Sequence, residues 1–378
     1  MNRIQMKPTV LIIGGGVSGS VCALSLRRQG IEVDLAEKSI FPRSKVCGCC
    51  IGGTGLSVLR RLQVEDWVSS EGQRLERWIG SIGGYRVEVP LDSGVAISRE
   101  RLDTELLLRV KQAGANVMVP VSAAVQSLDR NHVSVLLEDS SGENQVKQYD
   151  LVIVASGLNA TGANRLLPWK EPPHGPFGIS FYGSTSHLST GSLGMACDRD
   201  GYVGVVRLED GRVDIAAALK SGSDSRQVGK PVDRVLGILE RSRLELGCIE
   251  VQSRISVTPP LRRARLAGTG RLVAIGDASG YVEPFTGEGM TWGMMSGMAV
   301  ARLITESSMD ELSDLGDRWC RRQKQLLASK RRVCRLLTTS LQNSILRYGA
   351  GFLLSRIPIL ASPLVSHLAQ PWNPTSTR

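Results

Sequence analysis

The chain is poor in aromatic residues, which make up 4% of its 378 residues, and it has only four histidines. It also lacks helix-turn-helix, zinc-finger and RNA-binding signatures, so its formal net charge of +10 does not predict a nucleic-acid partner. No window reaches the roughly 18 uncharged apolar residues that would predict a membrane-spanning helix. The positive charge instead favours an anionic cofactor, an anionic substrate or a membrane surface.

The eight cysteines do not form the regular framework of a small secreted domain, so reduced thiols and a cytoplasmic location are expected. The single CxxC from Cys47 to Cys50 has no second CxxC or HxxxH to complete a zinc site, and we predict no metal centre. Lys7 and Pro8 lead directly into a strand pattern, which is not the order of a signal peptide. With 42% hydrophobic and 22% charged residues, the chain has ordinary globular composition.

A dinucleotide-binding loop follows the first predicted strand, residues 9 to 13. Gly14 permits the tight turn, Gly16 lets the backbone approach a pyrophosphate, and Gly19 permits close packing of the next helix. A second predicted strand, residues 32 to 36, ends at Glu37, where a carboxylate can accept hydrogen bonds from ribose hydroxyls. Lys38 cannot accept them, although it belongs to the candidate cofactor site by position. This pattern favours FAD or NAD over NADP.

A second segment, GDASGYVEPFTGEGM at 276 to 290, extends the prediction from a dinucleotide to FAD. It follows a predicted strand at 272 to 275. Residues 151 to 157 show the same arrangement, because a four-residue apolar strand is followed there by small residues. Gly276 turns the chain, and Asp277 can accept a hydrogen bond from a ribityl hydroxyl. A helix that opens near Gly287 and Gly289 offers free NH groups to the flavin or pyrophosphate.

At this point the chain resembles flavoproteins of the geranylgeranyl reductase family, within the larger group of aromatic-ring hydroxylases and flavin-dependent halogenases. The resemblance rests on GGGVSG at 14 to 19, FPRSKVCG at 41 to 48, ISRERLDTELL at 97 to 107 and the segment at 276 to 290. It implies FAD contacts from Arg43, Lys45, Cys47, Gly48, Arg99, Pro284, Gly287, Gly289 and Met290. Asp103 is expected to support Arg99.

The implied fold is α/β, with a Rossmann-like FAD-binding domain of the p-hydroxybenzoate hydroxylase and glutathione reductase type. We assign residues 1–75, 95–170 and 255–308 to this discontinuous domain. Period-2 stretches between Pro172 and Pro259 predict an antiparallel sheet, so residues 76–94 and 171–254 are assigned to a substrate-binding sheet. Residues 309–378 form a C-terminal helical region.

Cys47 is the candidate catalytic residue, because the resemblance places its loop beside the flavin ring. Nearby Arg43 and Lys45 would favour its thiolate, and the thiol could donate a proton or tune the flavin. A small buried cysteine that only fills space is the alternative. Cys49 and Cys50 depart from the usual residues of the family, and a Cys47/Cys50 dithiol redox pair is a further alternative.

The predicted activity is that of an FAD-dependent oxidoreductase on a hydrophobic substrate, by C=C reduction of a prenyl or related lipid-like chain. NAD(P)H or another reductant would be a transient electron donor. The alternatives are a flavin-dependent monooxygenase of an aromatic or polyketide-derived substrate and a flavin/thiol redox partner. The sheet carries Tyr202 to Arg207 where prenyl reductases have Tyr-x-Trp-x-Phe-Pro, and Ala155-Ser156-Gly157 replaces the Ala-Asp-Gly of hydroxylases.

The C-terminal arm combines a basic helical run, 310 to 342, with the apolar stretch FLLSRIPILASPLVSHLA at 352 to 369. Arg356, Pro358 and Pro363 interrupt this stretch, so it cannot span a bilayer. Two interpretations stay open. The arm makes peripheral contact with a membrane surface, or it is a helical cap packed on the FAD-binding domain.

Overall fold

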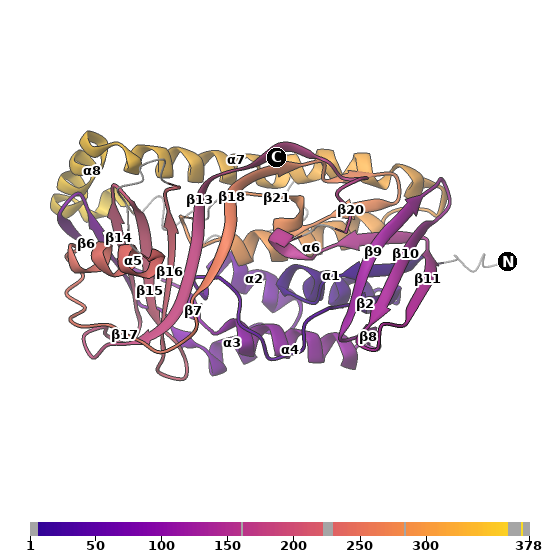
Figure 1. Cartoon of the computed structure of the whole chain (residues 1–378), viewed down its shortest axis with the longest axis horizontal. Coiled ribbons are helices and arrows are strands. Elements are labelled where there is room, and N and C mark those ends of the chain that lie inside the picture. The colour runs from indigo at the N-terminus through magenta and orange to yellow at the C-terminus, as the bar shows by residue number, and fades with distance from the viewer. Residues whose placement is uncertain (1–6, 160–161, 222–229, 283–284, 362–371, 373–378) are drawn as a thin grey trace.

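A computed structural model describes residues 7–159, 162–221, 230–282, 285–361 and 372 (Figure 1). Its α-helices are α1 (Val17–Arg28), α2 (Gly53–Arg61), α3 (Glu65–Glu71), α4 (Arg99–Gln112), α5 (Pro231–Glu240), α6 (Gly289–Thr305), α7 (Leu315–Gln342) and α8 (Ser344–Arg356). Short 3-10 turns lie at η1 (Gly157–Asn159), η2 (Gly276–Ser279), η3 (Asp310–Asp314) and η4 (Pro358–Ala361). The predicted α/β class is confirmed.

The first half of the chain supplies twelve strands. They are β1 (Thr9–Ile13), β2 (Glu32–Ala36), β3 (Cys50–Gly52), β4 (Gln73–Arg74), β5 (Arg77–Ile82), β6 (Tyr85–Pro90), β7 (Gly94–Ala96), β8 (Asn116–Met118), β9 (Val121–Leu128), β10 (Val133–Asp139), β11 (Asn144–Tyr149) and β12 (Leu151–Val154). The second half adds β13 (Trp169–Ser184), β14 (Ser192–Asp198), β15 (Gly201–Arg207), β16 (Val213–Leu219), β17 (Glu250–Val251), β18 (Ser256–Arg265), β19 (Gly268–Thr269), β20 (Leu272–Ala274) and β21 (Gly280–Tyr281).

A six-stranded sheet in the order β19-β20-β12-β1-β2-β8 forms the centre of the cofactor half. Its pairings are parallel except for β19 with β20. In β1, Val10 and Ile12 pack into the core with α1 and α4, whereas Leu11 packs into the core with β10. Both faces of the strand are therefore buried, as its continuous apolar run predicts. β1 lies between β2 and β12, which places its carboxyl end at the point where ligands bind in such sheets.

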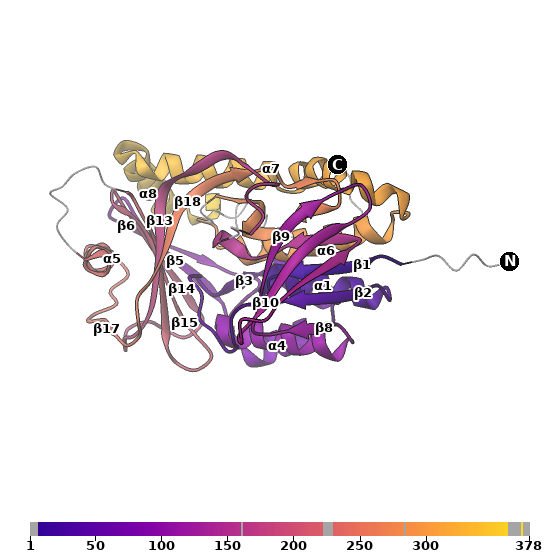
Figure 2. The same cartoon turned by 45° about the vertical axis from the view of Figure 1, so that its right-hand side comes forward.

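A nine-stranded sheet forms the other half, in the order β21-β18-β13-β16-β15-β14-β5-β6, with β17 paired to β13. Its pairings are antiparallel apart from β14 with β5, which run parallel. β18, which we assigned to the FAD-binding part by its residue range, pairs with β13 in this sheet. The exact domain boundaries stay a prediction. Figure 2 shows the nine-stranded sheet, which contains β13 and β18, on the left, and strands β1 and β2 of the six-stranded sheet on the right.

The basic helix α7 runs along the upper side of the molecule in both views and reaches over both halves (Figures 1 and 2). The buried Trp319 donates a hydrogen bond from Nε1 to the carbonyl oxygen of Ala274 at 2.8 Å, which fixes α7 on β20. Gln323 donates to the hydroxyl of Ser279 in η2. The beginning of α7 therefore packs on the FAD-binding half, while α8 lies against β5 and β6 at the far end. Pro363 and the rest of the apolar stretch after residue 361 fall outside the described residues.

Within the described ranges, none of the helices has both the length and the apolar character needed to cross a membrane.

Candidate functional site

The glycine loop connects β1 to the N-terminus of α1. Gly16 is the N-cap of α1 and provides no side-chain cap, so the first amide groups of the helix are available to a phosphate. A Cβ atom on Gly19 would overlap the carbonyl oxygen of Gly14, so this helix can approach the loop only with glycine at position 19. The loop therefore has the predicted form of a pyrophosphate cradle.

Glu37 is buried after β2 and braces this loop. One carboxylate oxygen accepts a hydrogen bond from the Gly15 amide at 2.8 Å, and the other accepts from the Ser39 amide at 2.8 Å. Each oxygen has a second lone pair, which can accept from a ribose hydroxyl. Lys38 is exposed and does not line the cavity described below.

Two arginines from distant parts of the sequence lie beside Gly16. A Cβ atom built on Gly16 would lie 3.6 Å from Nη2 of Arg43 and 3.9 Å from Nη2 of Arg99. Arg99 forms a buried bidentate pair with Asp103, in which Nε donates to Oδ1 at 2.9 Å and Nη2 donates to Oδ2 at 2.7 Å. Asp103 therefore supports Arg99 in the way that the resemblance implies. The buried Nε of Arg43 has no hydrogen-bond partner within the described part of the chain. The Nε donor of Arg43 and the two guanidinium groups beside the glycine loop are suited to bind the phosphates of a dinucleotide.

The segment after β20 packs directly on the glycine loop and joins the two cofactor motifs into one site. Gly276 has φ of +57°, and a Cβ atom there would overlap the hydroxyl of Ser18 at the start of α1. Asp277 is half-buried, and desolvation raises its pKa, while the nearby Lys45 and Arg99 oppose the rise. Burial and Arg99 lower the pKa of Lys45, and Asp277 opposes that shift. These two groups therefore neutralise each other in part beside the loop.

The predicted helix after Gly287 is α6, which begins at Gly289 without a side-chain cap. Gly287 has φ of +74°, and no atom of the described residues lies within 4 Å of a Cβ built on it, so the backbone there is accessible to a ligand. Pro284 lies outside the described residues.

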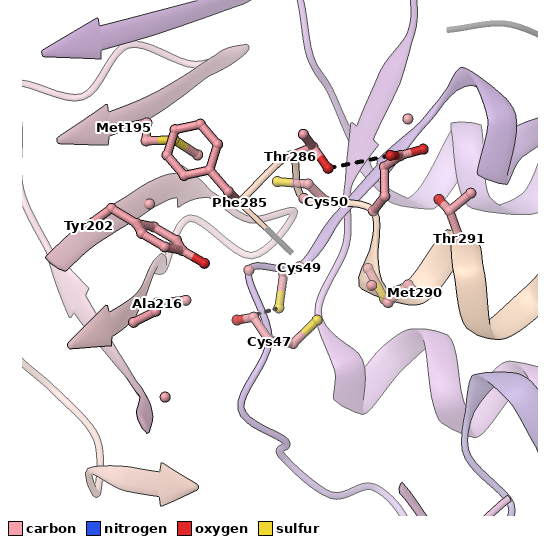
Figure 3. A pocket seen from close by; sticks show the side chains of 18 of the residues that line it. Cys47, Cys49, Cys50, Met195, Tyr202, Ala216, Phe285, Thr286, Met290 and Thr291 are labelled. Carbon is pink, nitrogen blue, oxygen red and sulfur yellow. Dashed lines mark hydrogen bonds between the residues drawn. The ribbon is translucent and has the colours of Figure 1, made fainter. Parts of the chain in front are cut away.

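The cysteine cluster lies between the glycine loop and the nine-stranded sheet (Figure 3). Cys49 donates from Sγ to the carbonyl oxygen of Cys47 at 4.0 Å. The hydrogen bond between the two thiols, together with Arg99, lowers the pKa of Cys47 to about 6 despite its burial. The same thiol–thiol hydrogen bond and burial raise the pKa of Cys49. The pair therefore shares one proton at neutral pH, with negative charge placed on Cys47.

Cys50 begins β3 and pairs with Ala96 of β7, so Cys47 and Cys50 do not open a helix together. Burial raises the pKa of Cys50, so its thiol is not activated. This arrangement differs from the thioredoxin-type dithiol considered from the sequence.

Asp214 in β16 is a site residue that the sequence did not indicate. Burial raises its pKa well above the usual range, although a hydrogen bond from the Cys49 side chain opposes the rise. Its Oδ2 atom has no partner within the described ranges. The carboxyl group of Asp214 therefore lies behind the Cys47/Cys49 pair, and its burial favours the protonated form. Only the fold brings β16 to this loop, which is why a lone Asp in a strand gave no signal.

A cavity of about 560 Å³ extends from these groups along the nine-stranded sheet. Nine of the predicted cofactor residues line it: Gly16, Lys45, Cys47, Gly48, Arg99, Asp277, Gly287, Gly289 and Met290. Five others support its edge without lining it: Gly14, Gly19, Glu37, Arg43 and Gly276. The sheet contributes Trp78, Ile82, Met195, Tyr202, Gly204 and Ala216, and the C-terminal helices contribute Leu337, Leu341, Leu346, Ala350 and Leu354.

On the sheet side of this cavity, alternate residues of β15 face the cavity and the residues between them face the core. Tyr202 and Gly204 line the cavity, whereas Val203 and Val205 are buried on the opposite face, in the core with α5. Figure 3 shows Tyr202 and Phe285 close together at this wall, and their rings meet edge to face with centroids 5.0 Å apart. The alternation in the sequence predicts two faces, but it does not say which face meets the flavin.

The parallel sheet, the glycine loop, the acid after β2 and the second segment at α6 define an FAD-dependent oxidoreductase. Comparisons with known proteins agree with this class. Residues 12–50 match the family model for the NAD(P)-binding Rossmann-like domain. The p-nitrophenol 4-monooxygenase of Pseudomonas putida has a similar structure, with a TM-score of 0.73, 14% identity, and coverage of 95% of this chain and 99% of that one.

Sequence relatives confirm the resemblance to prenyl-chain reductases. Menaquinone reductase of Mycobacterium tuberculosis is 27% identical over 340 residues, covering 82% of this chain and 80% of that protein. Digeranylgeranylglycerophospholipid reductase 1 of Methanopyrus kandleri is 25% identical over 351 residues, covering 88% of this chain and 91% of that protein. The predicted fold class, FAD cofactor and oxidoreductase class are therefore confirmed.

Proposed function

We propose that this protein uses FAD to reduce a C=C bond in a prenyl or related lipid-like chain. The observation that carries the proposal is the shape of the cavity. It begins at Cys47, Gly287 and Gly289 and continues past apolar strand residues as far as α7 and α8. An apolar space that extends this far from the cofactor motifs fits a hydrocarbon chain. The names of the curated relatives, which refer to menaquinone and to a digeranylgeranyl lipid, support the same substrate class.

The cofactor roles proposed for individual residues follow their positions. The loop of Gly14, Gly16 and Gly19 would hold the pyrophosphate at the N-terminus of α1, with Arg43 and Arg99 beside it. Glu37 would accept from the ribose hydroxyls. Lys38 is exposed at the edge of this region, so we propose only a long-range charge contribution from it.

The flavin end of the site would be formed by the second segment and the cysteine loop. Asp277, reached through the turn at Gly276, would accept from the ribityl chain, and the NH groups at Gly287, Gly289 and Met290 would face the ring system. Lys45 and Gly48 line the same space from the opposite side. The role predicted for Pro284 stays a prediction.

When bound and reduced, FAD supplies the hydride for such a reaction. A hydride added to one alkene carbon must be matched by a proton on the other. At neutral pH Cys49 holds the proton that the pair shares at the cavity wall. This proton would move from Cys49 to Sγ of Cys47 and on to the alkene carbon, which returns Cys47 to the thiolate that Arg99 stabilises. Asp214 would return a proton through Cys49. Two electrons for the next cycle would come from NAD(P)H or another reductant that binds transiently.

A monooxygenase is the second candidate, because aromatic side chains line part of the same cavity. Trp78, Tyr202 and Phe285 would suit an aromatic substrate, which would be hydroxylated with O₂ and a reductant. The third possibility is a flavin/thiol redox partner, whose transfer of electrons would need Cys47 and Cys50. The raised pKa of Cys50 does not support a dithiol exchange at neutral pH.

The proposed location is the cytoplasm, with peripheral membrane contact through the C-terminal region. No disulfide links any of the eight cysteines within the described residues, which is compatible with a reducing compartment. The exposed apolar residues of α8 support membrane contact.

The test is an anaerobic single turnover. The purified holoprotein is reduced chemically and mixed with a geranylgeranyl lipid that carries no quinone ring, and flavin reoxidation is followed by absorbance. The proposal expects reoxidation together with a product two hydrogens heavier by mass spectrometry. With O₂ admitted, a product one oxygen heavier would select the monooxygenase instead.

A Cys47→Ser variant separates the proton donor from the cofactor site. It should keep its flavin and lose roughly a hundredfold or more in the rate of alkene reduction, which is the usual contribution of a positioned proton donor. A Cys248→Ser variant, at an exposed cysteine, serves as the control. Full activity in Cys47→Ser would overturn the role of Cys47. Flavin reduction that NAD(P)H supports only when both Cys47 and Cys50 are present would select the redox partner.

A further inference from the structure

The surface carries one concentrated group of exposed apolar side chains, and it lies at the C-terminal helices. Of the sixteen exposed large hydrophobic residues in the described part of the chain, ten fall between Val333 and Leu360. Ile345 is 80% exposed, Leu353 is 48% exposed and Ile359 is 72% exposed. Isolated exposed apolar residues need no explanation, but a concentration of this kind marks an interaction surface.

α8 presents these residues because only a narrow part of it faces the protein. Gly351 is buried against the backbone of Ile82, where a Cβ atom would overlap the carbonyl oxygen. Tyr348 hydrogen-bonds to Tyr85 through the two hydroxyls at 2.7 Å, and Phe352 meets the same Tyr85 ring edge to face. The helix is thus held firmly on β5 and β6 while much of its apolar side remains outside.

The same helix closes the far end of the substrate cavity. Leu346, Ala350 and Leu354 line the cavity together with Leu337 and Leu341 of α7. Leu346 also remains 54% exposed, so the lining of the cavity is continuous with the apolar surface at this residue. A hydrocarbon chain could therefore pass between the surface and the cavity without crossing a polar layer.

Positive charge lies along α7, the helix that leads to this apolar surface. Residues 315–361 contain ten Lys or Arg residues and a single acidic residue, Asp317, in a chain whose formal net charge is +10. The exposed basic residues on α7 include Arg321, Lys324, Arg332 and Arg335. Both views place α7 and α8 along the same upper side of the molecule (Figures 1 and 2). Apolar residues flanked by Lys and Arg are the combination that binds an anionic lipid interface.

We propose that α8 and the exposed face of α7 dock on an anionic membrane surface, and that the substrate tail enters the cavity from the bilayer beside Leu346. The docking surface is defined as the exposed side chains of Ile345, Leu353 and Ile359 with Arg321, Lys324, Arg332 and Arg335. The entry route rests on the proposed function, whereas docking itself does not. Docking by α8 shortens the path from the bilayer to the flavin because the cavity already ends at that helix.

Vesicle co-sedimentation of the holoprotein tests the docking surface directly. The probes are vesicles of phosphatidylcholine alone and of phosphatidylcholine mixed with phosphatidylglycerol. The unchanged protein should bind the mixed vesicles at least tenfold more tightly, and binding should fall as ionic strength approaches about 1 M, where charges are screened beyond about 3 Å.

The Ile345→Glu, Leu353→Glu, Ile359→Glu triple variant should lose vesicle binding at least tenfold while keeping its flavin content. A matched control introduces two glutamates at exposed apolar positions far from α8, Leu108→Glu and Val146→Glu, which are 50% and 63% exposed. The control should bind as the unchanged protein does. An Arg332→Gln, Arg335→Gln variant should lose several-fold in binding to anionic vesicles only.

Activity separates docking from the proposed chemistry. The triple variant should reduce a vesicle-embedded prenyl lipid at least tenfold more slowly, yet reduce a short, water-dispersed prenyl alcohol at the normal rate. Equal loss on both substrates would overturn the entry route. Vesicle binding that is unchanged in the triple variant would overturn docking, as would a dimer in solution that this variant dissociates. If no prenyl substrate is reduced by any form, the proposed function fails while the vesicle result still stands.

Discussion

The cofactor side of the cavity and its sheet side present different atoms to a ligand. The cofactor side brings charged or ionisable groups close to the glycine loop in space, including the buried Arg99 and Asp103 and the half-buried Lys45 and Asp277. The sheet side presents aliphatic, aromatic and glycine residues, and its polar atoms are mostly backbone groups paired between strands. One side is held together by ion pairs and hydrogen bonds, and the other by packing.

This difference predicts different consequences for mutations. A buried ion leaves an unpaired charge when its partner is removed, so changes on the cofactor side should cost stability and flavin together. A change on the sheet side can alter the shape of the cavity at little cost in stability, because no polar partner is left behind.

The largest effect is expected for Asp103→Ala on the cofactor side. It leaves the buried guanidinium of Arg99 without its bidentate partner, which typically costs about 3–5 kcal/mol of unfolding free energy. Denaturant unfolding at a fixed FAD concentration measures the loss, since bound ligand raises the apparent stability. Flavin occupancy should fall in the same variant.

Glu306→Ala is the control for this variant, because it removes an exposed i,i+4 partner of Arg302 and should cost about 1 kcal/mol or less. A similarly small loss for Asp103→Ala, with flavin retained, would show that the cofactor side does not depend on this pair.

The intermediate effect is expected for Gly204→Leu on the sheet side. A Cβ atom at Gly204 would meet only the carbonyl oxygen of Ala216, at 3.7 Å, so the new side chain fits and occupies cavity space. Stability and flavin content should change little. Turnover of a long prenyl chain should fall about tenfold or more relative to a short one, the scale on which apolar pockets discriminate. Steady-state rates across a chain-length series provide the measurement.

Val203→Ala, one residue away on the opposite face of β15, is the matched control. It should lose about 1–2 kcal/mol of stability through the core beside α5, without a change in chain-length preference. Chain-length preference that shifts in Val203→Ala but not in Gly204→Leu would contradict the register argument.

The smallest effect is expected for Cys49→Ala, measured as the pH dependence of iodoacetamide alkylation at Cys47. In the unchanged protein freed of flavin, the rate should rise with pH around about 6, because the thiolate is the reactive form and is lost as pH falls through the pKa. Without the Cys49 thiol, the pKa should rise toward its ordinary value. Alkylation near pH 6.5 should then slow several-fold, as read by mass spectrometry of the Cys47 peptide. An unchanged profile would assign the low pKa to Arg99 alone.

Local sequence motifs were sufficient to predict most of the secondary structure on the cofactor side of the cavity. Strands at residues 9 to 13 and 32 to 36, the helix beginning at Gly289 and the support of Arg99 by Asp103 all occur where the sequence predicts them. Each depends on contacts between neighbours in the chain or on glycine positions that tolerate no side chain. The proposed roles of these residues toward FAD stay predictions.

The sheet side was predictable only in outline. Alternation in β15 indicated two faces, but the pairing that puts Tyr202 and Gly204 on the cavity depends on strands from residues 77–90, 169–219 and 256–265. Asp214 beside Cys49 and the leucines of α7 and α8 gave no local signal, because their neighbours are distant in the sequence. The parallel pairing of β14 with β5 is another long-range choice.

The cofactor class could be predicted from local sequence motifs, because a dinucleotide loop and its second segment are short-range patterns whose backbone geometry leaves few residue choices. The extent of the cavity, the face of the sheet that lines it and the position of α8 at its end, with apolar side chains outside, depend on the three-dimensional packing. Those features arise from packing between elements far apart in the chain, where many sequences satisfy the same apolar pattern.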